Sequence, residues 1–342
     1  MVKLFFKDSI IGFLLIKTCF MGDLLTYGFH LLGVQLHIVF NSKKIEKIIH
    51  RKDISPKIVD KLNLTQKIRT FGIDSLGFRE TKSYLRYYKH DEALLYVLIA
   101  SEKYKLQPYL WRFPIIGKVS YKGFFDPIMA RREWESLLKK GHDVRLRMVN
   151  AWSTLGYFPD PVTSGMLEMD EPILTNTILH EMFHATLFIP GNTDLSENLA
   201  TMIGDNATYL YLKQKYGAES SECRQFLHDL ERTSKFNKFM KEATERLDSL
   251  YNSEEFVKQS DIRKDSTKKH FIQKLMEDCP EKLSDLPKSC KYAQEISKHP
   301  NNAVFIIFKQ YHGLQDEYNI WFEQTSDLKN YIKSLKEKYG NN

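Results

Sequence analysis

The sequence predicts an α+β protein that is predominantly helical, with a small β-sheet and a helical C-terminal region. Two observations predict this class. Most of the chain shows the apolar spacing of amphipathic helices, whereas residues 110–158 are rich in aromatic and β-branched residues interrupted by glycine and proline. The 342 residues, of which 42% are hydrophobic, are enough to bury one large core or two ordinary ones. We expect an N-terminal segment over 1–19, a core over 20–217 and a helical region over 218–342 that packs on the core.

Residues 1–19 resemble a signal-like or membrane-anchoring segment. Lysines precede an apolar run over 10–16, which is too short to span a bilayer but has the length of the apolar part of a signal peptide. Cys19 follows in the place of a lipid-attachment cysteine, although Lys17 fits a cleavage site poorly. We therefore expect an exported or membrane-associated protein. An ordinary apolar helix and a cytoplasmic location are the alternatives.

Helices are expected over the first part of the core. Residues 20–40 are apolar with interspersed polar side chains, which is typical of an amphipathic helix on a core. Residues 43–106 have helical spacing with short breaks at 54–56 and 71–72. This interpretation includes residues 91–104, which we expect to continue the helical pattern.

Strands are expected in the middle of the chain. Residues 111–125 predict one or two strands with a bend near Gly117, and residues 143–149 alternate as a strand does. Between them, residues 127–140 predict a helix. Residues 153–158, followed by two prolines, predict a short edge strand.

The most specific motif is His180-Glu181-x-x-His184, inside a predicted helix over 172–188. At about 100° per residue the two histidines lie on one helical face, where two imidazoles can share one Zn²⁺. Glu181 lies one position round the helix, where a base acting on a zinc-bound water belongs. The neighbouring apolar residues indicate a buried helix, in which an unpartnered His-Glu-His set would be costly.

Glu197 is the predicted third ligand. It follows His184 by thirteen residues, on a second predicted helix over 195–215 that closes at Gly217. The Pro190-Gly191 pair predicts a turn that would bring Glu197 back to the histidines and leave a fourth position for water.

The C-terminal region is expected to be mostly charged helix. Its segments over 221–251, 266–277 and 324–338 have helical spacing, and residues 301–308 predict a capped, strongly apolar helix.

Composition argues against several other classes. The net charge of +7 is spread over lysine- and arginine-rich helices without a nucleic-acid motif, so no nucleic-acid partner is expected. None of the four cysteines forms a C-x-x-C pair, which argues against a cysteine zinc site. Cys279 and Cys290 are either two free thiols, which we favour, or a disulfide if the protein is exported.

Five segments share their spacing of aromatic, glycine, histidine and acidic residues with one known family. They are Trp111-x-Phe113-Pro114-x-x-Gly117-x-x-x-Tyr121-x-Gly123-x-Phe125, Ser153-Thr154-Leu155-Gly156-Tyr157-Phe158-x-Asp160-Pro161, His180-Glu181-x-x-His184, Glu197-x-x-Ala200-Thr201 and Asn301-Asn302-Ala303. With this set the chain resembles the bacterial predicted zinc aminopeptidases of the Aminopep family. The resemblance covers residues 20–340.

The resemblance implies a zincin-like metallopeptidase fold, with the small sheet beside the H-E-x-x-H helix. It implies that His180, His184 and Glu197 bind zinc and that Glu181 is the catalytic base. Members of this family commonly have the sequence features of exported or lipid-anchored proteins, in agreement with our interpretation of residues 1–19.

Two residues depart from the family pattern beside the third ligand. Ser196 stands where the family usually has Asn, and Asn192 stands where it usually has Asp. These departures concern residues that would orient Glu197, and they leave the three predicted metal ligands unchanged.

Other residues are candidates for contact with substrate. Tyr157, Tyr311 and His312 could stabilise an oxyanion. Asp160 and Asn301 or Asn302 could hold a free amine, by resemblance and residue type, although a turn residue before a proline is the simpler interpretation of Asp160.

Thr201, one turn after Glu197, is a candidate contact that orients this ligand; an ordinary helix residue is the alternative.

The predicted activity is zinc-assisted hydrolysis of peptide bonds, with an extended peptide bound along the edge strand over 153–158. An endopeptidase, or a hydrolase of another amide, on the same site is the nearer alternative. A non-catalytic metal-binding protein is the more distant one, and Glu181 argues against it because metal binding needs only the ligands. Oligomeric state is not predicted.

Overall fold

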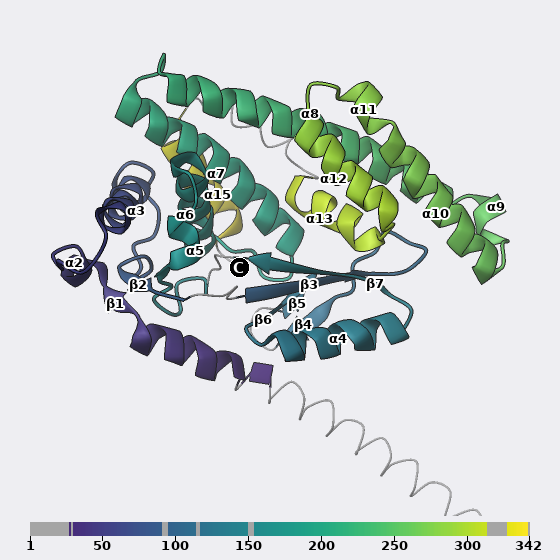
Figure 1. Cartoon of the computed structure of the whole chain (residues 1–342), viewed down its shortest axis with the longest axis horizontal. Coiled ribbons are helices and arrows are strands. Elements are labelled where there is room, and N and C mark those ends of the chain that lie inside the picture. Colours follow the sequence, from purple (N-terminus) through teal and green to yellow (C-terminus); the bar gives the residue numbers. More distant parts are fainter. Residues whose placement is uncertain are drawn as a thin grey trace, which may run out of the picture.

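The computed structural model describes residues 27–28, 30–90, 95–113, 117–149, 154–312 and 327–340, apart from the side chains of 310–312. It is mostly helical with small sheets, which confirms the α+β class (Figure 1). Residues 1–19, with Cys19, lie outside the described residues. Among those described, no helix is both long and apolar enough to cross a bilayer.

Helices make up both ends of the described chain. An N-terminal helix covers residues 27–41, with residue 29 left out. The other helices are α2 (Ile45–Ile48), α3 (Pro56–Asp74), α4 (Pro127–Lys139), α5 (Ser164–Leu167), α6 (Glu171–Thr186), α7 (Thr193–Tyr216), α8 (Ser221–Tyr251), α9 (Glu254–Val257), α10 (Asp261–Glu277), α11 (Cys279–Lys282), α12 (Pro287–Lys298), α13 (Asn302–His312) and α15 (Leu328–Tyr339).

The strands lie between the N-terminal helix and α5 in sequence and form three small sheets. They are β1 (Lys43–Lys44), β2 (Arg86–Tyr88), β3 (Leu95–Ser101), β4 (Trp111–Phe113), β5 (Gly117–Val119), β6 (Tyr121–Phe124), β7 (Asp143–Val149) and β8 (Val162–Thr163). The sheets have the orders β1-β2-β8, β6-β3-β7 and β4-β5. The predicted bend at Gly117 is confirmed, since this residue has φ +77° at the start of β5.

The antiparallel sheet β6-β3-β7 separates two sets of helices (Figure 1). Its even-numbered face, with Leu98, Phe124 and Val144, packs with residues of α4 in one buried cluster. Its odd-numbered face, with Val97 and Ile99, turns toward the C-terminal helices and a cavity described below.

The expectation of helix over 91–104 was wrong, because residues 95–101 form the central strand β3. This run, Leu-Tyr-Val-Leu-Ile-Ala-Ser, is covered on both faces and therefore lacks the alternation of a half-exposed strand. A short apolar run of this kind cannot be told from a buried helix by its period alone.

The expectation of an edge strand over 153–158 was also wrong for its described part, which is a turn. Leu155 and Gly156 have φ of +56° and +78°, outside the strand region. The turn is held by Asp160, whose carboxylate accepts hydrogen bonds from the Thr154 backbone N–H (2.9 Å) and hydroxyl (2.8 Å). A Cβ at Gly156 would lie 3.0 Å from the Thr81 methyl group, and its positive φ would strain any larger residue there.

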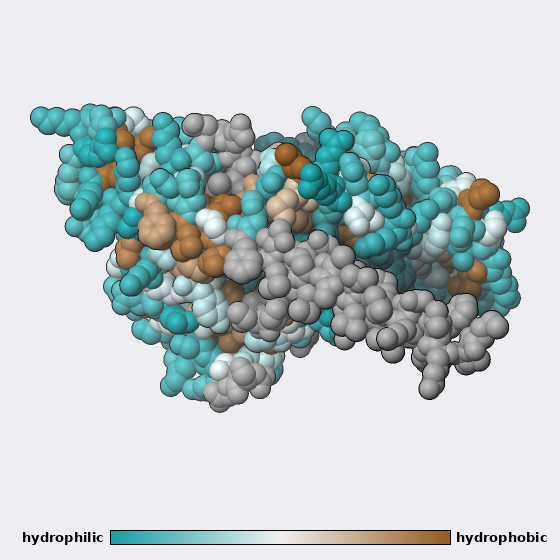
Figure 2. Space-filling view, turned by 90° about the horizontal axis from the view of Figure 1, so that it is seen from below, coloured by the Kyte–Doolittle hydropathy of each residue, from teal (hydrophilic) through white to brown (hydrophobic). Residues whose placement is uncertain are grey.

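The N-terminal helix leaves one apolar stripe in solvent. Leu32, Leu36 and Phe40 are 43%, 37% and 78% exposed, and their spacing of four residues places them on one side of the helix. Figure 2 shows this apolar surface over the N-terminal helix. Lys43, Lys44 and Lys47 follow it immediately and are exposed.

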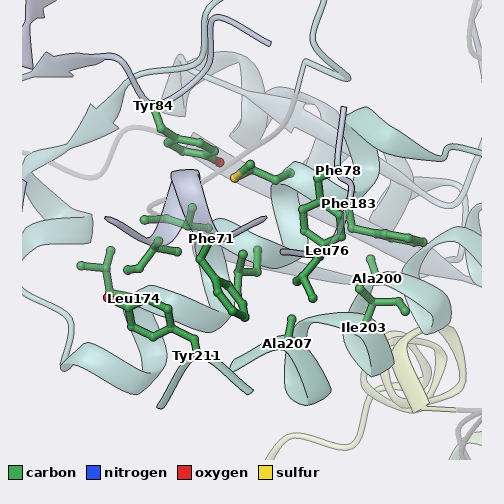
Figure 3. Packing of buried hydrophobic residues seen from close by; sticks show 14 of the residues in the cluster. Phe71, Leu76, Phe78, Tyr84, Leu174, Phe183, Ala200, Ile203, Ala207 and Tyr211 are labelled. Carbon is green, nitrogen blue, oxygen red and sulfur yellow. The ribbon is translucent and has the colours of Figure 1, made fainter. Parts of the chain in front are cut away.

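The largest buried cluster surrounds α6 and α7. Side chains from α3, α6, α7 and α15 meet there, including Phe71, Leu174, Phe183 and Ile203 (Figure 3). Because α15 contributes Tyr331 to this cluster, the end of the C-terminal region packs directly on the elements that precede it in sequence. A second cluster joins α8, α10, α12 and α13 to β3.

Cys279 and Cys290 are both buried free thiols, and their Sγ atoms are 2.8 Å apart. Burial and the neighbouring thiol raise the pKa of Cys279 to about 12. The two cysteines belong to α11 and α12, so their side chains bring these two helices into contact.

Asn302, at the start of α13, is fully buried and fully hydrogen-bonded. Its Oδ1 accepts from the Tyr251 hydroxyl (2.8 Å), and its Nδ2 donates to the carbonyl oxygens of Glu102 (2.9 Å) and Lys103 (3.1 Å). Nearby, Asn301 donates to the Val144 carbonyl oxygen (2.9 Å). Both amides therefore attach α13 to the ends of β3 and β7.

We predict that Asn302→Ala lowers the free energy of unfolding by about 3 kcal/mol, because it leaves several buried polar groups without partners. Urea denaturation of the purified protein measures this. The control is Asn252→Ala, since the exposed Asn252 bonds only within its own helix end, to Asp248 (2.9 Å). Equal stability of the two variants would contradict the structural role of Asn302.

Candidate metal centre

Helix α6 carries His180, Glu181 and His184. Pro172 in its first turn and Asp170 before it favour a helix start there. Leu174, Ile178, Leu179, Met182 and Phe183 fix its buried face in the main core. The histidines emerge on the remaining side, where their ring centroids are 4.8 Å apart.

Helix α7 carries Glu197 back toward α6. Asn192 caps α7, because its Oδ1 accepts from the Leu195 N–H (3.1 Å). The Ser196 hydroxyl accepts from the Ile189 N–H (3.1 Å) and donates to the Asn192 carbonyl oxygen (3.1 Å). The two residues that depart from the family pattern thus form the connection that positions Glu197.

Small residues let α7 approach α6 closely. Ala200 is fully buried between the helices, and a Cβ at Gly204 would lie only 3.4 Å from the Cβ of His180. Because this is an ordinary van der Waals contact, alanine would fit at position 204, whereas a side chain longer than alanine would push α7, with Glu197, away from the histidines.

The three candidate ligands converge on one point. His180 Nε2 and His184 Nε2 are 3.1 Å apart, and Glu197 Oε2 lies 3.5 Å and 3.4 Å from them. Tetrahedral Zn²⁺ with bonds of 2.0–2.1 Å requires neighbouring ligand atoms about 3.3 Å apart. The donor set and its spacing therefore fit Zn²⁺, and these residues form a group that could hold a metal ion.

Burial and charge act in opposite directions on the ligands. Burial alone would raise the pKa of Glu197, but the charges and hydrogen bonds of His184 and His180 outweigh it and hold that pKa far below its ordinary value. Burial alone would lower the pKa of His184, but Glu197 raises it. The Nδ1 atom of His184 is buried and lacks a hydrogen-bond partner in the described part of the chain.

Glu181 faces the cavity beside the ligands. Burial raises its pKa, the histidines lower it and Glu197 raises it further, and the net effect is a raised pKa. A carboxylate with a raised pKa is a better proton acceptor near neutral pH than an ordinary surface glutamate.

The metal-ligand cluster opens into a mainly apolar cavity of about 790 Å³. The N-terminal helix, the odd-numbered face of the sheet, the turn over 154–158 and α6 form its walls. The lining includes Leu31, Leu95, Val97, Phe125, Val149, Leu155 and Phe188. This volume is typical of a pocket for a small molecule or a short peptide.

Two residues near the cluster had not been predicted as site residues. The Tyr121 hydroxyl lies 3.4 Å from Glu197 Oε1 and lines the cavity. Asp205, on α7, accepts from the Asn176 amide (2.8 Å), and burial raises its pKa to about 6, although the charge of His180 opposes this. Tyr121 was part of the aromatic segment in the sequence, but a period-2 pattern does not identify which strand face meets the helices.

Only one of the described residues predicted to contact substrate lines the cavity. Tyr157 is 74% exposed and lines the cavity. Asp160, Asn301 and Asn302 do not line it, because their polar atoms bond to the turn at Thr154 or to the ends of β3 and β7.

The side chains of Tyr311 and His312 lie outside the described residues. Thr201 is half-buried on α7, and its hydroxyl has no hydrogen bond to a ligand residue among the residues described. Its role beside Glu197 stays a prediction.

The chain matches the family described as "Putative aminopeptidase" (Aminopep) over residues 26–340. Comparison with curated proteins and with solved structures gives no match. The family match covers the elements that form the metal-ligand cluster and the cavity.

We predict one Zn²⁺ per chain, bound by His180, His184 and Glu197. Removing one imidazole leaves two ligands, so His180→Ala should lose most of its zinc in the presence of a competing chelator. Metal analysis after gel filtration measures the occupancy. His228→Ala is the matched control, because His228 is an exposed histidine on α8. Full zinc occupancy in His180→Ala would refute the ligand set.

Proposed function

The chain belongs to the family described as "Putative aminopeptidase", and from this premise we propose that it is a zinc-dependent aminopeptidase with a zincin-like fold. One observation carries the proposal: the ligand atoms of His180, His184 and Glu197 have the mutual spacing of a tetrahedral zinc site. With three protein ligands, the fourth position remains for water or substrate, as in catalytic rather than structural zinc sites.

Bound Zn²⁺ would lower the pKa of its water toward neutrality and polarise the scissile carbonyl. Glu181 takes the water proton and delivers it to the leaving amine. Its place beside the ligands, inside the cavity, supports this role.

Tyr121 is the proposed donor to the oxyanion. Its hydroxyl faces the cavity and lies 3.4 Å from Oε1 of the metal ligand Glu197. A small rotation of the side chain would let the hydroxyl donate instead to a substrate oxygen bound beside Glu197. Tyr157 remains a second candidate, and its exposure together with its place in the cavity lining supports a contact with the entering peptide.

An endopeptidase, or another amide hydrolase, would use the same ligands and base. The cavity volume of about 790 Å³ is that of a small molecule or a short peptide, which favours a short substrate. A metal-binding protein without activity would not need Glu181 in the cavity.

We also propose that the protein is exported or membrane-associated. The apolar run over 10–16 is one support, and the exposed stripe of Leu32, Leu36 and Phe40 is another. The lysines that follow the stripe would favour anionic lipid headgroups. The apolar stripe would then lie in the membrane–water interface. The same helix also forms a wall of the cavity.

We predict that position 40 contacts lipid. In Phe40→Trp protein bound to phosphatidylglycerol-containing vesicles, brominated lipids should quench the added tryptophan, after subtraction of the signal of the four native ones. Ile262→Trp is the control, because Ile262 is 85% exposed on the distant helix α10. Equal quenching at both positions, or none at position 40, would contradict lipid contact by this helix.

We predict that the zinc-loaded protein removes N-terminal residues from short peptides and that acetylation of the substrate N-terminus lowers kcat/KM by at least tenfold. Glu181→Gln should keep zinc and fold but lose activity by several orders of magnitude, since an amide does not accept the water proton. Mass spectrometry of the digests measures both. Equal cleavage of free and acetylated peptides would support the endopeptidase instead, and near-normal turnover by Glu181→Gln would remove this residue from the mechanism.

A further inference from the structure

Outside the metal site, the charged side chains on the described walls of the cavity are of one sign. The described residues that line the cavity include the four residues of the metal site: His180, Glu181, His184 and Glu197. Apart from these, Arg147 is the one cationic side chain on the described walls, and no further carboxylate accompanies it there. The described cavity thus offers a free cation to a substrate and no free anion.

Arg147 lies on the same sheet face as the residues nearest the metal site. It pairs with Val97 of β3, which in turn pairs with Gly123 of β6. The next row along the sheet joins Tyr121, Ile99 and Arg145, and Tyr121 reaches Glu197.

Sheet geometry gives the distance between these positions. Two strands across the sheet and one two-residue repeat along it separate the Cα atoms of Tyr121 and Arg147 by about 12 Å. Three to four extended residues span this distance. The path between the two positions crosses β3 between Val97 and Ile99, whose apolar side chains line the cavity.

Arg147 also lacks an intramolecular partner. It is exposed to the cavity and makes no hydrogen bond or ion pair with any residue in the described part of the chain. Arg145, two residues earlier on the same face, is placed differently: its guanidinium carbon lies 5.7 Å from the centre of the Tyr292 ring. A planar guanidinium against an apolar wall is suited to bind a carboxylate through two parallel hydrogen bonds.

We propose that Arg147 binds a carboxylate of the substrate, and that the substrate is a short, mainly apolar peptide. This inference rests on the proposed peptidase function and adds the substrate class to it. The carboxylate lies three to four residues beyond the scissile bond. It is either the peptide's C-terminus or an acidic side chain at that position, since both present the same group to the guanidinium.

The test is a set of apolar peptides of two to six residues, cleaved by the zinc-loaded full chain. Each peptide is made with a free C-terminal carboxylate, as the C-terminal amide, and as the amide with Glu in the last position. The wild-type protein should prefer the free carboxylate over the amide by 10- to 100-fold in kcat/KM at a length of four or five residues. Recovery of activity by the Glu-containing amide would identify the side chain as an equivalent source.

Arg147→Gln should abolish this preference, and Arg147→Lys should restore part of it. Arg145→Gln is the matched control and should retain the preference, with zinc occupancy unchanged in all variants. The proposal is overturned if the wild type cleaves carboxylates and amides equally, or if Arg147→Gln still discriminates between them.

Binding separates this proposal from the proposed function. Calorimetry of the same peptide pairs with zinc-loaded Glu181→Gln protein should show tighter binding of the carboxylate form, and the difference should vanish when Arg147→Gln is added. Absence of cleavage of every peptide by the zinc-loaded wild type would refute the peptidase function, whereas equal binding of carboxylates and amides would refute the role of Arg147.

Discussion

The close packing of α6 against α7 is the constraint on which the rest of the structure depends. Neither helix alone holds three metal ligands, and the small residues Ala200 and Gly204 lie where the two helices approach closely. The helices are fixed against each other by the largest apolar cluster, which also recruits α3 and α15. Residues far from the site in sequence therefore contribute to its geometry through packing.

The same packing buries charges that would be costly without partners. Glu197 is stabilised as a carboxylate by the two histidines, whereas Glu181 and Asp160 are not compensated to the same extent and have raised pKa values. A bound Zn²⁺ would bring two positive charges to two buried glutamates. In this arrangement metal binding would offset part of the cost of burying them.

The sheet and the N-terminal helix decide what can reach the ligands. One sheet face packs on α4, and the other supplies Tyr121, Val97 and Arg147 to a cavity that is mainly apolar. The N-terminal helix forms one wall of this cavity, and its exposed apolar stripe begins at Leu32, which also lines the cavity. One helix thus connects the proposed membrane contact with the proposed substrate site.

The sequence by itself determined the local features: the four-residue spacing of His180 and His184, the ends of the site helices and the strand over 143–149. These depend on periods and turn residues within one segment. Only the tertiary structure decided that residues 95–101 form the central strand and that Tyr121 faces Glu197. In each case the deciding contacts come from distant segments, and a local pattern carries no information about which distant surface covers it.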